Sequence, residues 1–193
     1  SCPDQFPHTQ LGAVPMVVYG GDDMLYQNIC LGGNKTHTEL SLNGTAGYDG
    51  SPVSLEEYVE EVTALGNGDV EMFEKVNQPV FINGNAYLKG APAFAREEDN
   101  YLSEGDPQVK ISVEGDSVYL EMNVEKAMLS IPTEIIDTEK LGMVRLVEAP
   151  FDDPDGNPIV LDKDYLGKTR KAGSPAGPLE ELKEGFNRVK VWG

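Results

Sequence analysis

The sequence predicts an all-β fold, built from short strands with one helix. Turn-forming residues are frequent, with 21 Gly and 13 Pro among 193 residues, which is too much interruption for long helices. Apolar residues make up 39% of the chain and come in short runs that end at turn residues, as strands do. Only one segment has helical periodicity. Within the all-β class, a parallel β-helix is the favoured architecture and a β-sandwich is the alternative.

The charge of the chain excludes several classes of partner. The sequence carries 15 Lys+Arg against 33 Asp+Glu, a formal net charge of −18 and a pI near 4.3. Nucleic acid needs a basic surface that releases counterions, and an anionic membrane surface also needs basic residues. No apolar run approaches the length of a membrane span. We therefore expect an acidic, soluble, globular chain with neither nucleic-acid nor membrane partners.

Two short apolar runs precede a polar segment. Residues 16–19 and 25–31 each end at a glycine pair and are predicted to be strands. Residues 34–52 are rich in Gly, Thr and Asn, which predicts a surface loop.

The helix is predicted over residues 55–65. Ser54 and Glu57 form the pattern of a capping box, and Gly66 suits the C-terminal end. The apolar residues recur at helical spacing, whereas glutamates occupy the other side. The apolar positions are Leu55, Tyr58, Val59, Val62 and Leu65.

An internal similarity points to stacked strands. Strands are predicted at residues 79–83 and 86–88. The sequence NICLG at residues 28–32 is similar to NAYLKG at residues 85–90, since in both an Asn enters a short apolar run that ends in Gly. Short strands with Asn or Gly at the corners are typical of a parallel β-helix, in which each turn of chain buries its apolar face against its neighbours.

The second half of the chain has a different pattern. Residues 109–113 and 118–124 flank a short turn and predict a hairpin. Residues 144–147 and 159–161 flank a loop at 151–158, and 188–192 predicts a last strand. The simplest interpretation is that these strands of residues 109–193 pair antiparallel. We therefore expect one compact unit, with parallel rungs and the inserted helix in 1–108 and antiparallel hairpins and closing strands in 109–193.

Few residues in the sequence suit metal or nucleophilic chemistry. Only two histidines occur, His8 and His37, and neither forms a zinc-ligand pattern with Cys2 or Cys30. The cysteines form one disulfide or stay free thiols. No nucleophile elbow, dinucleotide-binding glycine motif or phosphate-binding loop occurs. We expect no metal and no cofactor.

The oxygen-rich segment DDPDGN at residues 152–157 has two interpretations. Its side chains suit calcium, but the acidic position twelve of an EF-hand loop falls on Lys163 or Asp164 rather than on Glu. A Pro-Asp-Gly turn explains the same residues without a metal. Carboxylate pairs also suit glycosidic-bond hydrolysis, but among 33 acidic residues no pair is singled out.

Several ordered motifs resemble one enzyme family. They are PHT at 7–9, VVYGGDD at 17–23, YQNI at 26–29, SLEEY at 54–58, QPVFIN at 78–83, NAYL at 85–88, GA at 90–91, EGDSVYL at 114–120, PDG at 154–156, DKDYL at 162–166 and KVW at 190–192. In order and spacing they are similar to the late part of the β-xylosidase-like glycoside hydrolases of family 120.

The resemblance implies a right-handed parallel β-helix and a chain that matches only the C-terminal third of the enzyme. The two catalytic carboxylates of such enzymes lie on earlier rungs, so no catalytic residue is expected here. His8 and Thr9 resemble a loop that follows those rungs and are the predicted substrate-binding residues. Family members have Pro-His-Ser-Thr at this place, and this sequence, with Pro-His-Thr, is one residue shorter.

The resemblance further implies a role in hydrolysis of β-xylosides or short xylo-oligosaccharides, with retention. The chain would support the catalytic rungs and depend on the N-terminal remainder of the enzyme to cover its open end, with a homo-oligomer as a further option. A non-catalytic carbohydrate-binding or interaction module is the alternative, with Tyr48, Tyr101 or Tyr165 as platforms. An independent enzyme that uses its own carboxylates is another. Cytoplasmic and secreted locations both stay open.

Overall fold

The computed structural model describes residues 23–33, 44–65, 78–144 and 149–193. Strands dominate over helices, which confirms the all-β class. The chain divides into two compact units. Unit 1 comprises Ser1–Met24, Gly50–Phe81 and Thr138–Pro158, and unit 2 comprises Leu25–Asp49, Ile82–Asp137 and Ile159–Gly193.

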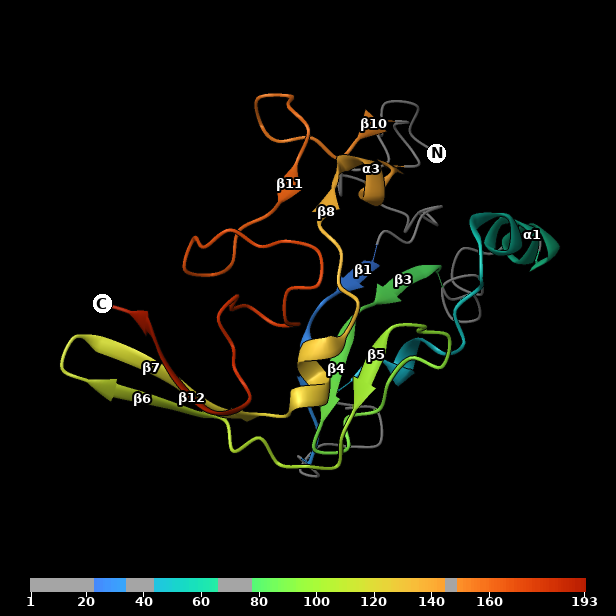
Figure 1. Ribbon diagram of the computed structural model, residues 1–193. Helices are drawn as coiled ribbons and strands as arrows, with labels where there is room; N and C mark the ends of the chain where they lie inside the picture. The colour runs from blue at the N-terminus through green and yellow to red at the C-terminus, as the bar shows by residue number, and fades with distance from the viewer. Residues whose placement is uncertain (1–22, 34–43, 66–77, 145–148) are drawn as a thin grey trace. The chain divides into compact units, whose positions relative to one another are not determined.

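A parallel sheet lies in unit 2. It is formed by β2 (Ile29–Leu31), β4 (Asn85–Leu88) and β5 (Asn100–Leu102) in the order β2-β4-β5, and β4 and β5 lie side by side in Figure 1. All four residues of β4 are buried because it is the central strand. The two segments matched in the sequence pair with one another directly, since Ile29 is opposite Ala86 and Leu31 opposite Leu88.

The predicted strand over residues 25–31 is wrong in its extent. The chain divides there into β1 (Asp23–Tyr26) and β2, and β1 pairs with β3 (Val80–Asn83). Gln27 breaks the run because its φ is +58°, in the left-handed region that a strand does not use. Gly84 makes the corresponding break between β3 and β4 with φ +76°, and the Gln27 N–H donates to the Asn83 carbonyl at 3.2 Å.

The predicted helix is found with its predicted bounds, as α1 (Leu55–Leu65) in unit 1. Ser54 Oγ accepts the Glu57 N–H at 3.2 Å, as a capping box requires. The Glu57 carboxylate instead accepts the N–H of Val53, one residue before the expected donor, at 2.5 Å. Tyr58 and Val62 are the buried residues of the helix.

The second three-stranded sheet of unit 2 is antiparallel. Its strands are β6 (Lys110–Glu114), β7 (Ser117–Val124) and β12 (Gly185–Trp192), in the order β12-β7-β6 (Figure 1). The predicted hairpin is confirmed, with Glu114 opposite Ser117 across the turn. The last strand is longer than predicted and runs antiparallel to β7.

The remaining strands have only two residues each and correct the sequence interpretation. β9 (Met143–Val144) pairs with β10 (Ala149–Pro150) in unit 1, and β11 (Val160–Leu161) pairs with β8 (Ile136–Asp137) in unit 2. Val144 is therefore opposite Ala149 and Val160 is opposite Asp137, so these residues of the two predicted strands do not pair with each other. Among the described residues, three helical turns were not predicted: η1 (Ala46–Tyr48), η2 (Lys126–Ser130) and α3 (Thr138–Leu141).

A hydrophobic core joins the two three-stranded sheets of unit 2. It joins residues of β4 and β7 with residues from the segments that connect the strands, and Met128 at its centre is fully buried. The cluster consists of Ala86, Leu88, Met122, Val124, Met128, Ile131, Ala176, Leu179 and Leu182. Because segments distant in sequence share this core, it fixes the position of the parallel strands relative to the antiparallel sheet.

Candidate functional site

The residues predicted to contact substrate, His8 and Thr9, lie outside the described residues, as do His37 and Cys2. Among the described residues, the parallel sheet brings several polar groups together. Three features stand out in the described parts of the chain: a buried network around Glu97, an exposed carboxylate at Glu125, and two loops organised by single aspartates.

The buried network begins with an asparagine at the start of each strand. Asn28 precedes β2, Asn85 opens β4, and Asn100 lies opposite Asn85 at the start of β5. Asn85 Oδ1 accepts the Asn28 backbone N–H at 2.7 Å and the Asn28 Nδ2–H at 3.0 Å. Asn85 Nδ2 donates onward to the Leu25 carbonyl at 2.9 Å. The asparagine shared by the two sequence segments therefore links neighbouring strands through its side chain.

Glu97 holds the other end of this network. Its Oε1 accepts the Asn85 backbone N–H at 2.9 Å and the Asn85 Nδ2–H at 2.8 Å. Its Oε2 accepts the Tyr87 phenol at 2.5 Å. Thr45 Oγ1 lies 2.6 Å from the Tyr87 oxygen and accepts the Phe94 N–H at 2.9 Å. Since Tyr87 gives its one proton to the carboxylate, Thr45 donates to Tyr87, and every member of the chain is satisfied.

Burial and the carboxylate set the protonation of this site. Burial, together with the hydrogen bond to Glu97, raises the pKa of Tyr87 well above its ordinary value. Burial and the negative charge of Glu97 also raise the pKa of the half-buried Cys30 thiol, which forms no disulfide within the described residues. Tyr87 is therefore a neutral donor and Cys30 a neutral thiol near pH 7.

This arrangement indicates a structural role for Glu97. Both of its oxygens are used by donors of β4, and Asn85 and Tyr87 are fully buried. A nucleophile or general acid needs an oxygen that reaches substrate. Glu97 instead connects the segment before β5 to β4. Thr45 connects the segment that precedes η1 to Tyr87 of the same strand.

A second carboxylate, Glu125, lies at the surface of unit 2. Its oxygens accept the Tyr101 phenol at 2.7 Å and the Ser103 hydroxyl at 2.5 Å. These hydrogen bonds, that from Ser103 foremost, hold the pKa of Glu125 below its ordinary value, whereas burial and Glu125 raise the pKa of Tyr101. Tyr101 is a packing residue, since it contacts the hydrophobic core. Among the three tyrosines considered as sugar platforms, Tyr165 is the most exposed, at 62%.

The loop at residues 152–157 is a turn, as its Pro-Asp-Gly chemistry predicts. Asp153 Oδ1 accepts the backbone N–H groups of Asp155 at 2.9 Å and Asn157 at 2.8 Å. The Asn157 side-chain amide donates to both Asp153 oxygens. These donors, the Asn157 backbone N–H foremost, hold the pKa of Asp153 below its ordinary value. The carboxylate thus closes the loop from within.

A second loop in unit 2 repeats this arrangement and was not predicted. Asp164 Oδ1 accepts the N–H groups of Leu166 and Lys168, both at 2.8 Å, and Oδ2 accepts the Glu180 N–H at 2.9 Å. Burial alone would raise the pKa of Asp164, but these three backbone donors keep it below its ordinary value. The available signal was the recurrence of Asp-x-x-Gly at residues 153–156 and 164–167.

The described residues contain no group of three or more His, Cys, Asp or Glu side chains placed to hold a metal ion. Where the structure describes the chain, none of its helices has the length and apolar character needed to cross a membrane.

Comparison with known proteins gives one informative similarity. No protein-family model matches the sequence, and no curated protein matches it. Among solved structures, the chain is similar to XylC, in a structure described as the complex of XylC with xylose. The match has 43% sequence identity and a TM-score of 0.76 over 91% of this chain. The chain spans only 27% of the length of XylC.

Proposed function

We propose that the chain is the C-terminal portion of a β-xylosidase-like glycoside hydrolase of the family 120 type. The observation that carries this proposal is the similarity to XylC, at 43% identity over 91% of the chain and in a structure with xylose. Because the match covers 27% of XylC, the proposal places the catalytic carboxylates on another part of the complete enzyme. The substrates would be β-xylosides or short xylo-oligosaccharides, hydrolysed with retention.

In this proposal the chain contributes rigidity rather than catalytic groups. Residues 1–108 would form the last rungs of a right-handed parallel β-helix, and residues 109–193 would close it. The parallel pairing of β2, β4 and β5 supports this assignment. So does the buried Glu97 network, because a polar network with every member satisfied holds neighbouring strands in one register. A fixed register would keep catalytic rungs stacked on these strands at a fixed spacing.

His8 and Thr9 are the proposed contacts to the sugar. Imidazole and hydroxyl groups donate and accept hydrogen bonds, which suits the hydroxyls of a pentose. In the complete enzyme, His8→Ala and Thr9→Ala should raise KM for a β-xyloside more than they lower kcat. Unchanged kinetic constants in both variants would remove these residues from the proposal.

The decisive experiment separates the chain from the rest of the enzyme. Hydrolysis of a chromogenic β-xyloside is measured for the purified chain, for the N-terminal remainder and for the two together, with circular dichroism confirming that each is folded. The proposal expects no turnover by the chain alone and turnover when the two parts combine. Turnover by the chain alone would contradict it, because a catalytic pair would then lie among these 193 residues.

A non-catalytic carbohydrate-binding module is the second candidate, favoured by exposed aromatic side chains. Tyr165 is 62% exposed and Trp192 is 69% exposed, and sugars stack on aromatic faces in such modules. This candidate expects the chain alone to bind xylo-oligosaccharides in a calorimetric titration, without turnover. Tyr165→Ala or Trp192→Ala should then abolish the binding heat, whereas Phe81→Ala, at a 37% exposed aromatic on β3, should not.

A further inference from the structure

The edge strand β6 leaves backbone groups available for pairing. In the part of the chain that the structure describes, β7 lies on one side of β6 and no strand lies on the other. Four of its five residues are exposed, and only Ser112 is half-buried. An edge strand of this kind presents a row of N–H and C=O groups that can pair with another strand.

The turn determines which backbone groups are free. The β6–β7 turn has two residues, with Gly115 at φ +59° and Asp116 outside the residues of positive φ, as in a type II′ turn. Glu114 and Ser117 close this turn as a hydrogen-bonded pair, and such pairs alternate along the ladder. The N–H and C=O groups of Ile111 and Val113 therefore point away from β7.

The sequence of β6 is complementary to itself in antiparallel orientation. It reads Lys-Ile-Ser-Val-Glu over residues 110–114. When two copies pair antiparallel about Ser112, Lys110 lies opposite the partner's Glu114, and Ile111 lies opposite the partner's Val113. The two oppositely charged pairs are favourable cross-strand pairs. The free backbone groups also fall at the correct places, since Ile111 and Val113 become the hydrogen-bonded pairs.

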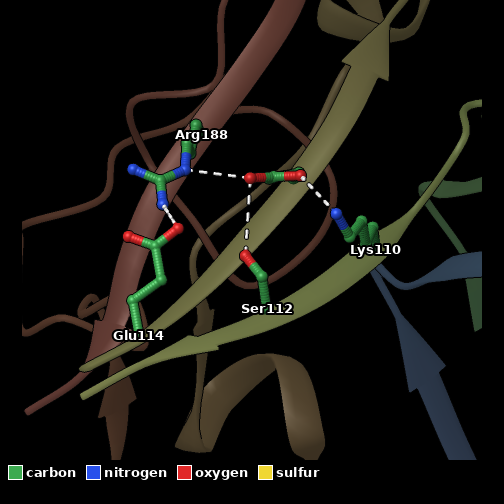
Figure 2. A network of polar contacts seen from close by, with 5 residues as sticks. Lys110, Ser112, Glu114 and Arg188 are labelled. Carbon is green, nitrogen blue, oxygen red and sulfur yellow. Dashed lines mark hydrogen bonds and ion pairs between the residues drawn. The ribbon is translucent and has the colours of Figure 1, made fainter. Parts of the chain in front are cut away.

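The two faces of the sheet support the same pairing. Figure 2 shows Lys110, Ser112 and Glu114 on one face, where Arg188 binds Glu114 at 2.5 Å. On the other face, Ile111 is 59% and Val113 is 71% exposed. Pairing about Ser112 brings four of these aliphatic side chains together across the axis and reduces their exposure to water.

We propose that two copies of this chain associate through β6, with a two-fold axis at Ser112, into one six-stranded antiparallel sheet. The contact is isologous, because the same strand serves both copies. Each copy carries a net charge of −18, so the association should be weaker at low ionic strength, where long-range repulsion is less screened. The competing interpretation, in which Lys110 and Glu114 protect the edge from pairing, predicts a monomer.

Charge reversal tests the register. Sedimentation equilibrium at 0.15 M salt is run on the chain and on Lys110→Glu, Glu114→Lys and the double swap. The unaltered chain should reach twice the 21.0 kDa of the single chain. Each single reversal should weaken the dimer about tenfold, because both pairs become like-charged, and the double swap should restore it. Lys171→Glu and Glu98→Lys make the same charge changes elsewhere on the exposed surface and should leave the dimer unchanged.

A cross-link provides a measurement that does not depend on affinity. Ser112 lies on the proposed axis in a non-hydrogen-bonded pair, where the Cα separation of about 4.5 Å suits a disulfide. Ser112→Cys should therefore form a covalent dimer under mild oxidation, whereas Ser130→Cys, at an exposed serine outside the sheet, should not. A monomer at every concentration, single reversals without effect, or equal cross-linking of both cysteine variants would overturn the proposal.

Discussion

Tyr87 donates its phenolic hydrogen to Glu97 across 2.5 Å, and both side chains are buried. The pair lies ten residues apart in sequence and joins the central strand β4 to the segment that precedes β5. A carboxylate in the interior normally costs free energy, but here Asn85 and Tyr87 supply three donors to it. The network therefore behaves as one unit, and removal of one member should affect the others.

Tyr87→Phe should destabilise the chain without a change of fold. The substitution leaves Glu97 Oε2 and Thr45 without their partner in the interior, which costs about 1–3 kcal/mol. Urea denaturation followed by circular dichroism measures the loss. Tyr101→Phe is the matched control, because its phenol binds the exposed Glu125 and should cost about 0.5 kcal/mol or less. Equal losses in the two variants would contradict the assigned role of the network.

Met128→Ala should be among the most damaging substitutions in the core. Met128 is fully buried among residues of β4 and β7, and a large-to-small change at such a site costs about 2–5 kcal/mol. Met143→Ala removes the same atoms at a side chain that is 52% exposed and should cost much less. Thermal unfolding of both variants compares them, and a smaller loss at Met128 than at Met143 would be inconsistent with the core described here.

Asp164→Asn should lower the free energy of unfolding at neutral pH and make that free energy less dependent on pH in acid. The pKa of Asp164 lies below the ordinary value of 3.8, so the folded state favours the ionised carboxylate. That contribution is fully present above pH 3.8 and is lost as the pH falls through the lower, folded pKa. Replacement of the acceptor should cost about 1–3 kcal/mol at pH 7.

The difference between Asp164→Asn and the original chain should narrow as the pH falls from 5 to 2, measured by urea midpoints at each pH. Asp116→Asn, at the exposed turn between β6 and β7, serves as the control with little change in midpoint. A difference in urea midpoint that grows toward low pH would contradict a lowered pKa for the Asp164 carboxylate.

The Cys30 thiol should react slowly in the folded chain. Burial and Glu97 raise its pKa above the ordinary 9.0, so the thiolate fraction is small near pH 8. In a Cys2→Ser variant, which leaves one thiol, alkylation by iodoacetamide should be slower than in the urea-unfolded chain. The rate should rise with an inflection above pH 9. Glu97→Gln should shift the inflection downward, and an inflection below 9 in the original chain would contradict this environment.

Local pattern predicted the helix and the hairpin well, because each is determined by residues close in sequence. The capping residues and the apolar face defined α1 to the residue, and the turn at Gly115 defined β6 and β7. The similarity of the segments that begin at Asn28 and Asn85 predicted stacked strands, and these two segments pair in parallel. Asn100, which holds the same place at the start of β5, was not predicted as a third such asparagine because β5 has only three residues.

The pairing of the shortest strands could not be predicted, for a physical reason. Two-residue strands such as β8 and β11 carry no alternation of apolar and polar residues, so only the folded context selects their partners. Glu97 was missed because it stands in an acidic segment beside Glu98 and Asp99, where sequence offers no sign that one carboxylate is buried. The predicted contacts His8 and Thr9 stay predictions.

The loops centred on Asp153 and Asp164 are held largely by hydrogen bonds to their own aspartates. In each loop the aspartate accepts backbone N–H groups from residues two to four positions later, and Asp164 also accepts the Glu180 N–H. A hydrophobic core therefore places few demands on the residues between the aspartate and the glycine. Homologous chains could exchange those residues, or lengthen the intervals that separate the loops, with little penalty to folding. This stretch is thus a natural place for sequence divergence and for the insertion of new recognition elements.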